Sequence, residues 1–120
     1  MHELTLCRHL LARVTRLARE REARAVTHVT VEVGPLSGVV PELLAQAFHV
    51  AKRGGAADTA TLAIETPPPT VRCPQCGAEN VVSPTRLTCP ACGACRVDLL
   101  RGDGLILKSV DLSLDARPPS

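Results

Sequence analysis

The sequence predicts an α+β protein, in which two helices pack on a three-stranded sheet and a four-cysteine zinc-ribbon domain is inserted before the last strand. Three observations support this fold class. Apolar residues recur at helical spacing near the N-terminus, apolar and polar residues alternate in strand-like stretches, and a Cys-x-x-Cys unit occurs twice after three prolines. At 120 residues, the chain forms one modest domain or two small ones.

The first predicted element is a helix from Glu3 to about Arg24. Most arginines of this segment fall on one side of the helix, interspersed with Glu20 and Glu22. The apolar stripe consists of Leu4, Cys7, Leu10, Leu11, Val14, Leu17 and Ala18. This pattern is typical of an amphipathic helix with one face on a core and a charged face in solvent.

Three stretches are expected to be strands of one sheet. In THVTVEV, Val29, Val31 and Val33 alternate with polar residues, which predicts a half-buried strand. TLAIET is a second strand, and the β-prone stretch from 105 to 114, near the C-terminus, supplies the third. Lys108 interrupts the apolar face expected on this last strand, which is formed by Ile106, Val110, Leu112 and Leu114.

A second helix is expected between the first two strands, and a proline run then marks a domain boundary. Pro41 suits the first turn of this helix, and Gly54-Gly55 ends it. The prolines at 67–69 form a stiff spacer that cannot continue a helix or a central strand. We therefore predict an α/β domain made of residues 1–66 and 103–116, with a zinc-binding domain, residues 67–102, inserted between them.

The strongest pattern in the chain is a pair of matching units, CPQCG at 73–77 and CPACG at 89–93. Each Cys-x-x-Cys lets two thiolates hold one ion, and the following glycine gives the backbone freedom that the turn needs. The intervening residues 77–88 are long enough for a hairpin that brings the units together. Four thiolates make a closed tetrahedral site typical of structural Zn²⁺. The predicted zinc ligands are Cys73, Cys76, Cys89 and Cys92.

Two other interpretations of the cysteine units are weaker. A thiol–disulfide enzyme would oxidise Cys73 and Cys76 reversibly, but such enzymes normally carry one Cys-x-x-Cys at the start of a helix. An iron–sulfur cluster also uses four cysteines, although closely spaced pairs of this form favour a single ion. Cys7 is expected to be a small buried residue of the helix, and Cys95 fits the ligand spacing less well than Cys92.

Composition argues against several classes of partner. The net charge is +2 and only 1% of residues are aromatic, which disfavours the main rival hypothesis, a zinc-ribbon nucleic-acid binder with an arginine-rich helix. No apolar run is long enough to span a membrane. The N-terminal stretch also lacks the layout of a signal peptide, so we expect a cytoplasmic protein whose thiols stay reduced.

The chain begins with MHELTLC, which places an imidazole directly after the residue that carries the free amine. The amine of Met1, the first backbone amides and the ring of His2 lie within short chelate rings of one another. A large second residue also disfavours removal of the initiator methionine. Two interpretations follow: a metal site at the chain start, or an ordinary terminus on which a histidine falls. Position alone does not decide between them.

Four features occur along the chain in a fixed order: MHELTLC, VTVEVGPLSGVVPELLAQAF, the two CPxCG units, and GDGLILKSVDL. In this combination they resemble the hydrogenase maturation nickel metallochaperones, the HypA/HybF family, and the resemblance extends to about Leu114. It implies a small cytoplasmic Ni²⁺ carrier with no enzymatic activity. Such a carrier delivers the ion for [NiFe]-hydrogenase assembly and, in some organisms, also serves urease.

The resemblance also implies ligands and partners. Nickel is then held by the α-amine of Met1, by the imidazole and amide nitrogen of His2, and by the amide nitrogen of Glu3, while the four cysteines hold zinc. The implied partners are a nickel-insertion GTPase and the precursor of the hydrogenase large subunit. Nitrogen donors favour planar Ni²⁺ and thiolates favour tetrahedral Zn²⁺, so donor type and geometry separate the two metals.

Overall fold

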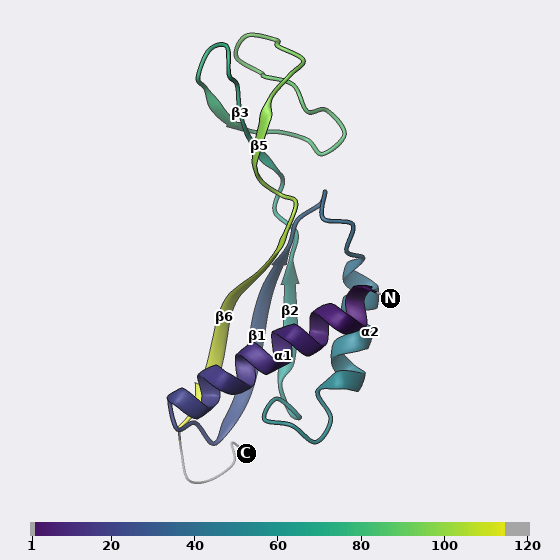
Figure 1. The fold of residues 1–120 in the computed structure, drawn as a ribbon, viewed down its shortest axis with the longest axis vertical. Coiled ribbons are helices and arrows are strands. Elements are labelled where there is room, and N and C mark those ends of the chain that lie inside the picture. The colour runs from purple at the N-terminus through teal and green to yellow at the C-terminus, as the bar shows by residue number, and fades with distance from the viewer. Residues whose placement is uncertain (1, 115–120) are drawn as a thin grey trace. The chain divides into compact units, whose positions relative to one another are not determined.

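The structure, a computed structural model, describes residues 2–114, with the backbone alone described for His2. Within these residues, two helices, α1 (His2–Glu20) and α2 (Pro41–Ala51), accompany six strands (Figure 1). The strands are β1 (Ala25–Val33), β2 (Thr61–Glu65), β3 (Thr70–Arg72), β4 (Glu79–Val81), β5 (Asp98–Arg101) and β6 (Leu105–Ser113). Neither described helix combines the length and the apolar character that a membrane crossing requires.

These elements form two compact units. The first contains the described residues up to Val31, the segment Val40–Ile64 and the described residues from Leu107 onward. The second contains Glu32–Val39 and Glu65–Ile106. Both ends of the described chain therefore lie in the first unit, and the cysteine segment lies in the second. The membership of Glu32–Val39 in the second unit was not expected from the sequence.

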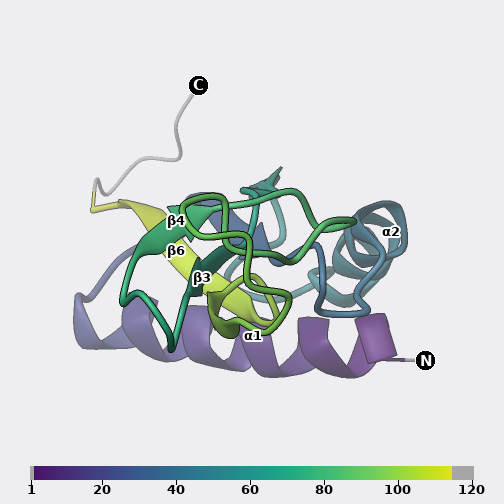
Figure 2. The same ribbon diagram turned by 90° about the horizontal axis from the view of Figure 1, so that it is seen from above.

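The first unit is built on a three-stranded sheet with the strand order β2-β1-β6. Arg24 N–H donates to the Ser113 carbonyl at 2.8 Å, and the Thr27 hydroxyl donates to the Asp111 carbonyl at 3.1 Å, so β1 and β6 run antiparallel. α1 crosses one face of this sheet, and α2 packs against α1 (Figure 1, Figure 2). The predicted α+β fold class, with its last strand from the C-terminal part, is therefore confirmed.

The core of the first unit is aliphatic, as the near absence of aromatic residues predicts. The buried stripe of α1, at most 6% exposed, consists of Cys7, Leu10, Val14 and Ala18. The other fully buried residues of this core come from β1 and α2 and include Val26, Val29, Val31, Leu44 and Phe48. Burial of such aliphatic and aromatic side chains contributes about 1.5–3 kcal/mol each, so these contacts supply most of the stability of the unit.

The face expected on β6 is partly wrong. Ile106 and Leu114, expected on the apolar face, are 43% and 67% exposed. The less exposed apolar residues of the strand are Leu105, Leu107, Val110 and Leu112. The alternation changes phase at Lys108 and Ser109, which are two consecutive exposed residues. A strict two-residue period drawn across this point therefore assigns one end of the strand to the wrong face.

The second unit has its own three-stranded sheet with the strand order β4-β3-β5. Both pairings are antiparallel, and Val71 lies opposite Asn80 on β4 and opposite Leu99 on β5. Apart from Val71 and Pro69, few apolar side chains of residues 65–106 are fully buried. Apolar packing alone therefore gives this small sheet little stability.

Backbone contacts join the segment Glu32–Val39 to the second unit. Gly34 N–H donates to the Gly104 carbonyl at 2.9 Å, and Leu36 N–H donates to the Gly102 carbonyl at 2.8 Å. A Cβ added at Gly34 would lie 2.2 Å from the Gly102 carbonyl oxygen, so only glycine permits this approach of two backbones. The approach depends on the folded chain and has no local sequence signature.

An ion pair accompanies these backbone contacts. The guanidinium of Arg101 donates to the carboxylate of Glu32, whose side chain is 9% exposed. Glu32 belongs to the polar side of the alternating strand, and its burial is explained by this pairing, because a buried carboxylate needs a charged or hydrogen-bonding partner.

Gly34→Ala should destabilise the protein by about 2 kcal/mol or more, because the added Cβ would clash with backbone atoms of Gly102, and no side-chain rotation can relieve this clash. Gly104→Ala is the matched control, since a Cβ there meets nothing within 4 Å. It should change the free energy of unfolding by less than about 0.5 kcal/mol. Denaturant unfolding followed by circular dichroism measures both variants. Equal stability of the two would contradict the close approach.

Candidate metal centre

Two tight turns with the same backbone geometry carry the four predicted zinc ligands. In the first turn, Cys73 N–H donates to the Ala78 carbonyl at 2.9 Å and Gly77 N–H donates to the Cys73 carbonyl at 2.8 Å. The second turn repeats both bonds at the same distances, through Cys89, Gly93 and Ala94. Gly77 and Gly93 have φ angles of 76° and 77°, a left-handed conformation that glycine adopts without steric penalty.

The two turns bring four thiols to one point. The sulfur of Cys73 lies 3.5 Å from that of Cys92, and the sulfur of Cys76 lies 3.6 Å from that of Cys89. All four sulfurs lie within 4.8 Å of one another. A tetrahedral Zn²⁺ with Zn–S bonds of about 2.3 Å needs sulfurs about 3.8 Å apart. The number, type and spacing of the donors therefore fit Zn²⁺ with no open position for water.

The environments of the four thiols are unequal. The backbone N–H groups of Cys92 and Ala91 donate to the Cys89 sulfur and lower the pKa of Cys89 to about 7. For Cys92 the Ala94 N–H acts in the same sense, but the hydrogen bonds that the Cys92 thiol donates to Cys73 and Cys89, together with burial, outweigh it and raise the pKa to about 12. A divalent cation is what allows all four to ionise together.

The remaining cysteines lie outside this tetrad. Among the side chains that the structure describes, Cys73, Cys76, Cys89 and Cys92 form the one group of three or more potential ligands placed around a common point. Cys95 is exposed and not part of it. Cys7 is fully buried and its Sγ donates to the Leu44 carbonyl at 3.4 Å. Burial, with the nearby charge of Glu3, raises the pKa of Cys7 to about 11, so this thiol stays neutral.

The stretch expected to bind nickel lies at the start of α1. Met1 and the side chain of His2 fall outside the described residues, and the backbone of His2 is the first residue of the helix. Glu3 is 8% exposed, and its carboxylate accepts a hydrogen bond from Val40 N–H at 3.2 Å. The start of α1 is therefore tied to the start of α2 by the side chain of Glu3.

This role of the Glu3 side chain was missed from the sequence. Val40 is the N-cap residue of α2 and makes no side-chain capping bond, and Pro41 follows it. Helix starts usually carry Ser, Thr, Asp or Asn as the cap, because the first N–H groups have no acceptor within the helix. An apolar residue in the cap position was therefore the available signal that an acceptor comes from elsewhere in the chain. A carboxylate is also favoured there by the helix dipole.

Cys76→Ser should abolish zinc binding and unfold the second unit, because three thiolates leave the tetrahedral site open and little apolar packing replaces the lost bond. Cys95→Ser is the matched control, since Cys95 is an exposed cysteine of the same segment outside the tetrad. It should retain zinc and structure. Elemental analysis of the purified variants, with circular dichroism, measures both. Loss of zinc from Cys95→Ser alone would contradict the ligand assignment.

The zinc affinity of metal-free protein should fall as the pH is lowered, because Zn²⁺ binds thiolates and competes with protons. In metal-free protein the second unit is unfolded, so its thiols are mostly protonated below their unperturbed pKa of about 8.5. Each must lose its proton to bind, and folding around zinc restores the backbone hydrogen bonds that lower the pKa of Cys89 to about 7. Calorimetric titration with Zn²⁺ at several pH values measures the affinity. An affinity that stays constant between about pH 8 and about pH 6 would contradict ligation by four thiolates.

Known proteins resemble this chain over nearly its whole length. A family model described as "Hydrogenase/urease nickel incorporation, metallochaperone, hypA" matches residues 1–112. The hydrogenase maturation factor HypA of Aquifex aeolicus is 37% identical over 115 residues, which cover 96% of this chain and 100% of the relative. The hydrogenase maturation factor HypA of Nitrosospira multiformis is 38% identical over 112 residues, which cover 93% of this chain and 97% of the relative.

A solved structure shares the fold. The solution structure of the Ni metallochaperone HypA from Helicobacter pylori matches with a TM-score of 0.74 at 20% identity, covering 94% of this chain and 98% of that one. The family model spans nearly the whole chain, and relatives above 30% identity cover more than nine-tenths of it. The chain therefore belongs to the HypA family of hydrogenase maturation factors, which are metallochaperones for nickel incorporation and not enzymes.

Proposed function

We propose that this chain binds Ni²⁺ at its N-terminus and delivers it for [NiFe]-hydrogenase maturation, while a structural Zn²⁺ held by Cys73, Cys76, Cys89 and Cys92 keeps the second unit folded. The nickel ligands are the α-amine of Met1, the imidazole and amide nitrogen of His2, and the amide nitrogen of Glu3. Membership of the HypA family carries the nickel role, and the donor geometry of the cysteine tetrad carries the zinc role.

The place of His2 and Glu3 at the start of α1 supports ligation of nickel by their backbone amide nitrogens. Both residues lie in the first turn of α1, where backbone N–H groups have no acceptor within the helix. Loss of their protons to a metal therefore breaks no intrahelical bond. The positive end of the helix dipole disfavours a cation, and deprotonated amide nitrogens offset this by supplying negative donors. Nickel affinity should accordingly fall as the pH falls.

The two metals are separated by donor chemistry. Thiolates in a closed tetrahedron suit Zn²⁺, whereas nitrogen donors in a plane suit Ni²⁺. A site at the edge of the chain is accessible to another protein, as release of the ion requires. A tetrahedral site with sulfur in all four positions leaves no open position for an exchanging ligand, and it serves stability instead.

The proposed partners are the nickel-insertion GTPase of hydrogenase maturation and the precursor of the hydrogenase large subunit, with urease as a further recipient in some organisms. The proposed compartment is the cytoplasm, because six free cysteines need a reducing environment. The family description, hydrogenase/urease nickel incorporation, supports this assignment of recipients.

His2→Ala should weaken Ni²⁺ binding by roughly tenfold or more, because one ring donor and its chelate ring are lost. His9→Ala is the matched control on the same helix, since His9 is exposed. It should leave nickel affinity unchanged, and both variants should keep their zinc. Isothermal titration with Ni²⁺ measures the affinities. Equal nickel affinity of His2→Ala and wild type would refute the placement of the site.

Glu3→Ala should keep nickel affinity within a few-fold of wild type but reduce stability by about 1 kcal/mol, since the backbone amide remains while the acceptor for Val40 N–H is lost. Glu3→Gln should restore most of this stability, because its amide oxygen still accepts the bond. Thermal unfolding and nickel titration of both variants measure the two effects. If Glu3→Ala lost nickel without losing stability, the side chain and not the amide would be the ligand.

A further inference from the structure

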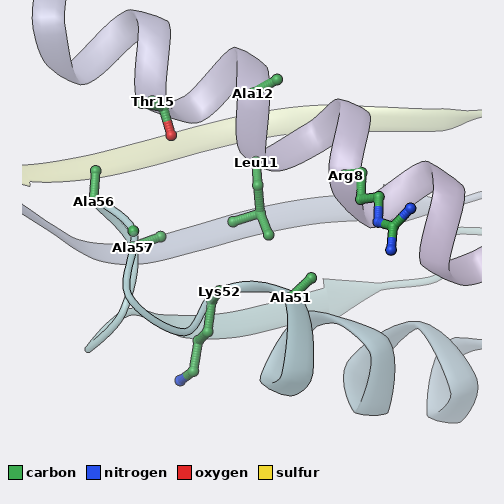
Figure 3. Close-up of a pocket in the computed structure, with 9 residues that line it drawn as sticks. Arg8, Leu11, Ala12, Thr15, Ala51, Lys52, Ala56 and Ala57 are labelled. Atoms are coloured by element: carbon green, nitrogen blue, oxygen red, sulfur yellow. The ribbon is translucent and has the colours of Figure 1, made fainter.

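A pocket of about 260 Å³ opens between α1 and the C-terminal end of α2 in the first unit (Figure 3). Its lining comes from one side of α1, from the last turn of α2 and from the loop that follows. Sites for drug-sized ligands usually measure about 300–1,000 Å³. A pocket of this size therefore suits a side chain of another protein better than a whole cofactor.

Small and aliphatic side chains form the interior of the pocket. Leu11 extends from α1 toward the loop that carries Ala57, and the methyl group of Ala51 faces α1 (Figure 3). Ala57 is 2% exposed, and Ala56 and Gly55 continue the lining. Because these side chains are too short to fill the space, the helices leave a hollow with an apolar floor. An aliphatic side chain placed there would lose its contact with water.

Two cations border this apolar floor. The ammonium of Lys52 donates to the Ala60 carbonyl at 2.9 Å and lies 5.8 Å from the centre of the Phe48 ring. Arg8 is exposed, and no carboxylate in the described part of the chain forms an ion pair with its guanidinium or with Lys52. The border of the pocket therefore carries positive charge that no carboxylate among residues 3–114 neutralises through an ion pair.

The pocket is close to the proposed nickel site along the helix. Arg8 follows His2 by six residues, which corresponds to about 9 Å along the axis of α1. Leu4, one turn before Arg8 and on the same side of the helix, is 39% exposed. A polypeptide seated in the pocket would therefore lie beside the chain start from which nickel is released.

We propose that this pocket docks an acidic segment of the protein that takes nickel from this chain, with one aliphatic side chain in the hollow and a neighbouring carboxylate paired with Arg8. The proposal rests on the nickel-delivery function above and adds the surface through which the recipient is held. A carboxylate is the expected neighbour because it neutralises the unpaired guanidinium in a charge-assisted contact. Electrostatic complementarity of this kind also speeds and orients the encounter.

The test measures binding of the purified nickel-insertion GTPase to nickel-loaded full-length chain. Arg8→Glu and Ala51→Leu should each weaken binding at least tenfold, the first by charge reversal and the second by filling the hollow. Arg8→Lys should recover part of the affinity, and added salt should weaken wild-type binding more than Arg8→Glu binding. Arg16→Glu is the matched control, since Arg16 is exposed on the same helix and does not line the pocket.

Separate measurements distinguish failure of docking from failure of nickel binding. Each variant is also titrated with Ni²⁺ alone and checked for zinc and helix content, all of which should match wild type. Unchanged GTPase affinity in Arg8→Glu and Ala51→Leu would overturn the proposal, as would absence of GTPase binding to wild type. Light scattering provides a further check. If the wild type were a dimer that Arg8→Glu dissociates, the pocket would bind a second copy of this chain, and the docking proposal would be overturned. Loss of nickel binding in wild type would refute the proposed function instead.

Discussion

The meeting of four cysteine sulfurs within 4.8 Å is the contact on which the second unit depends. Its sheet strands are three or four residues long and bury little apolar surface, so thiolate coordination has to replace a hydrophobic core. The paired turns make this possible, because Gly77 and Gly93 hold the same left-handed conformation and both turns close through the same hydrogen bonds. Repetition of one backbone motif creates the tetrahedral arrangement.

The first unit is stabilised by a hydrophobic core and not by metal coordination. An aliphatic core holds α1 on its sheet, and the Glu3 carboxylate ties the start of α1 to the start of α2. The beginning of the chain is thus anchored by a side chain while its main-chain nitrogens stay at the helix end. In the proposed function, this combination holds the ion in a defined place that a recipient can still reach.

Local patterns in the sequence were sufficient for the helices and strands of the first unit and for the tetrad, but not for the short strands β3 and β5 of the second unit. The spacing of the two CPxCG units indicated which cysteines come together, and helical spacing indicated the buried stripe of α1. The contact of Gly34 with Gly102 joins Glu32–Val39 to the second unit through backbone atoms, which leave no pattern of side chains. The face of β6 was misassigned at Ile106 because the alternation changes phase within the strand.

The proposed function requires an open chain start that binds Ni²⁺ independently of the sulfur site. The most direct measurement is the metal content of two proteins offered both ions together: the untagged chain, and a copy with extra residues before Met1 that removes the free amine from its position beside His2. We expect the untagged chain to retain nickel and zinc, and the extended copy to retain zinc alone. Equal nickel in the two proteins would contradict the account.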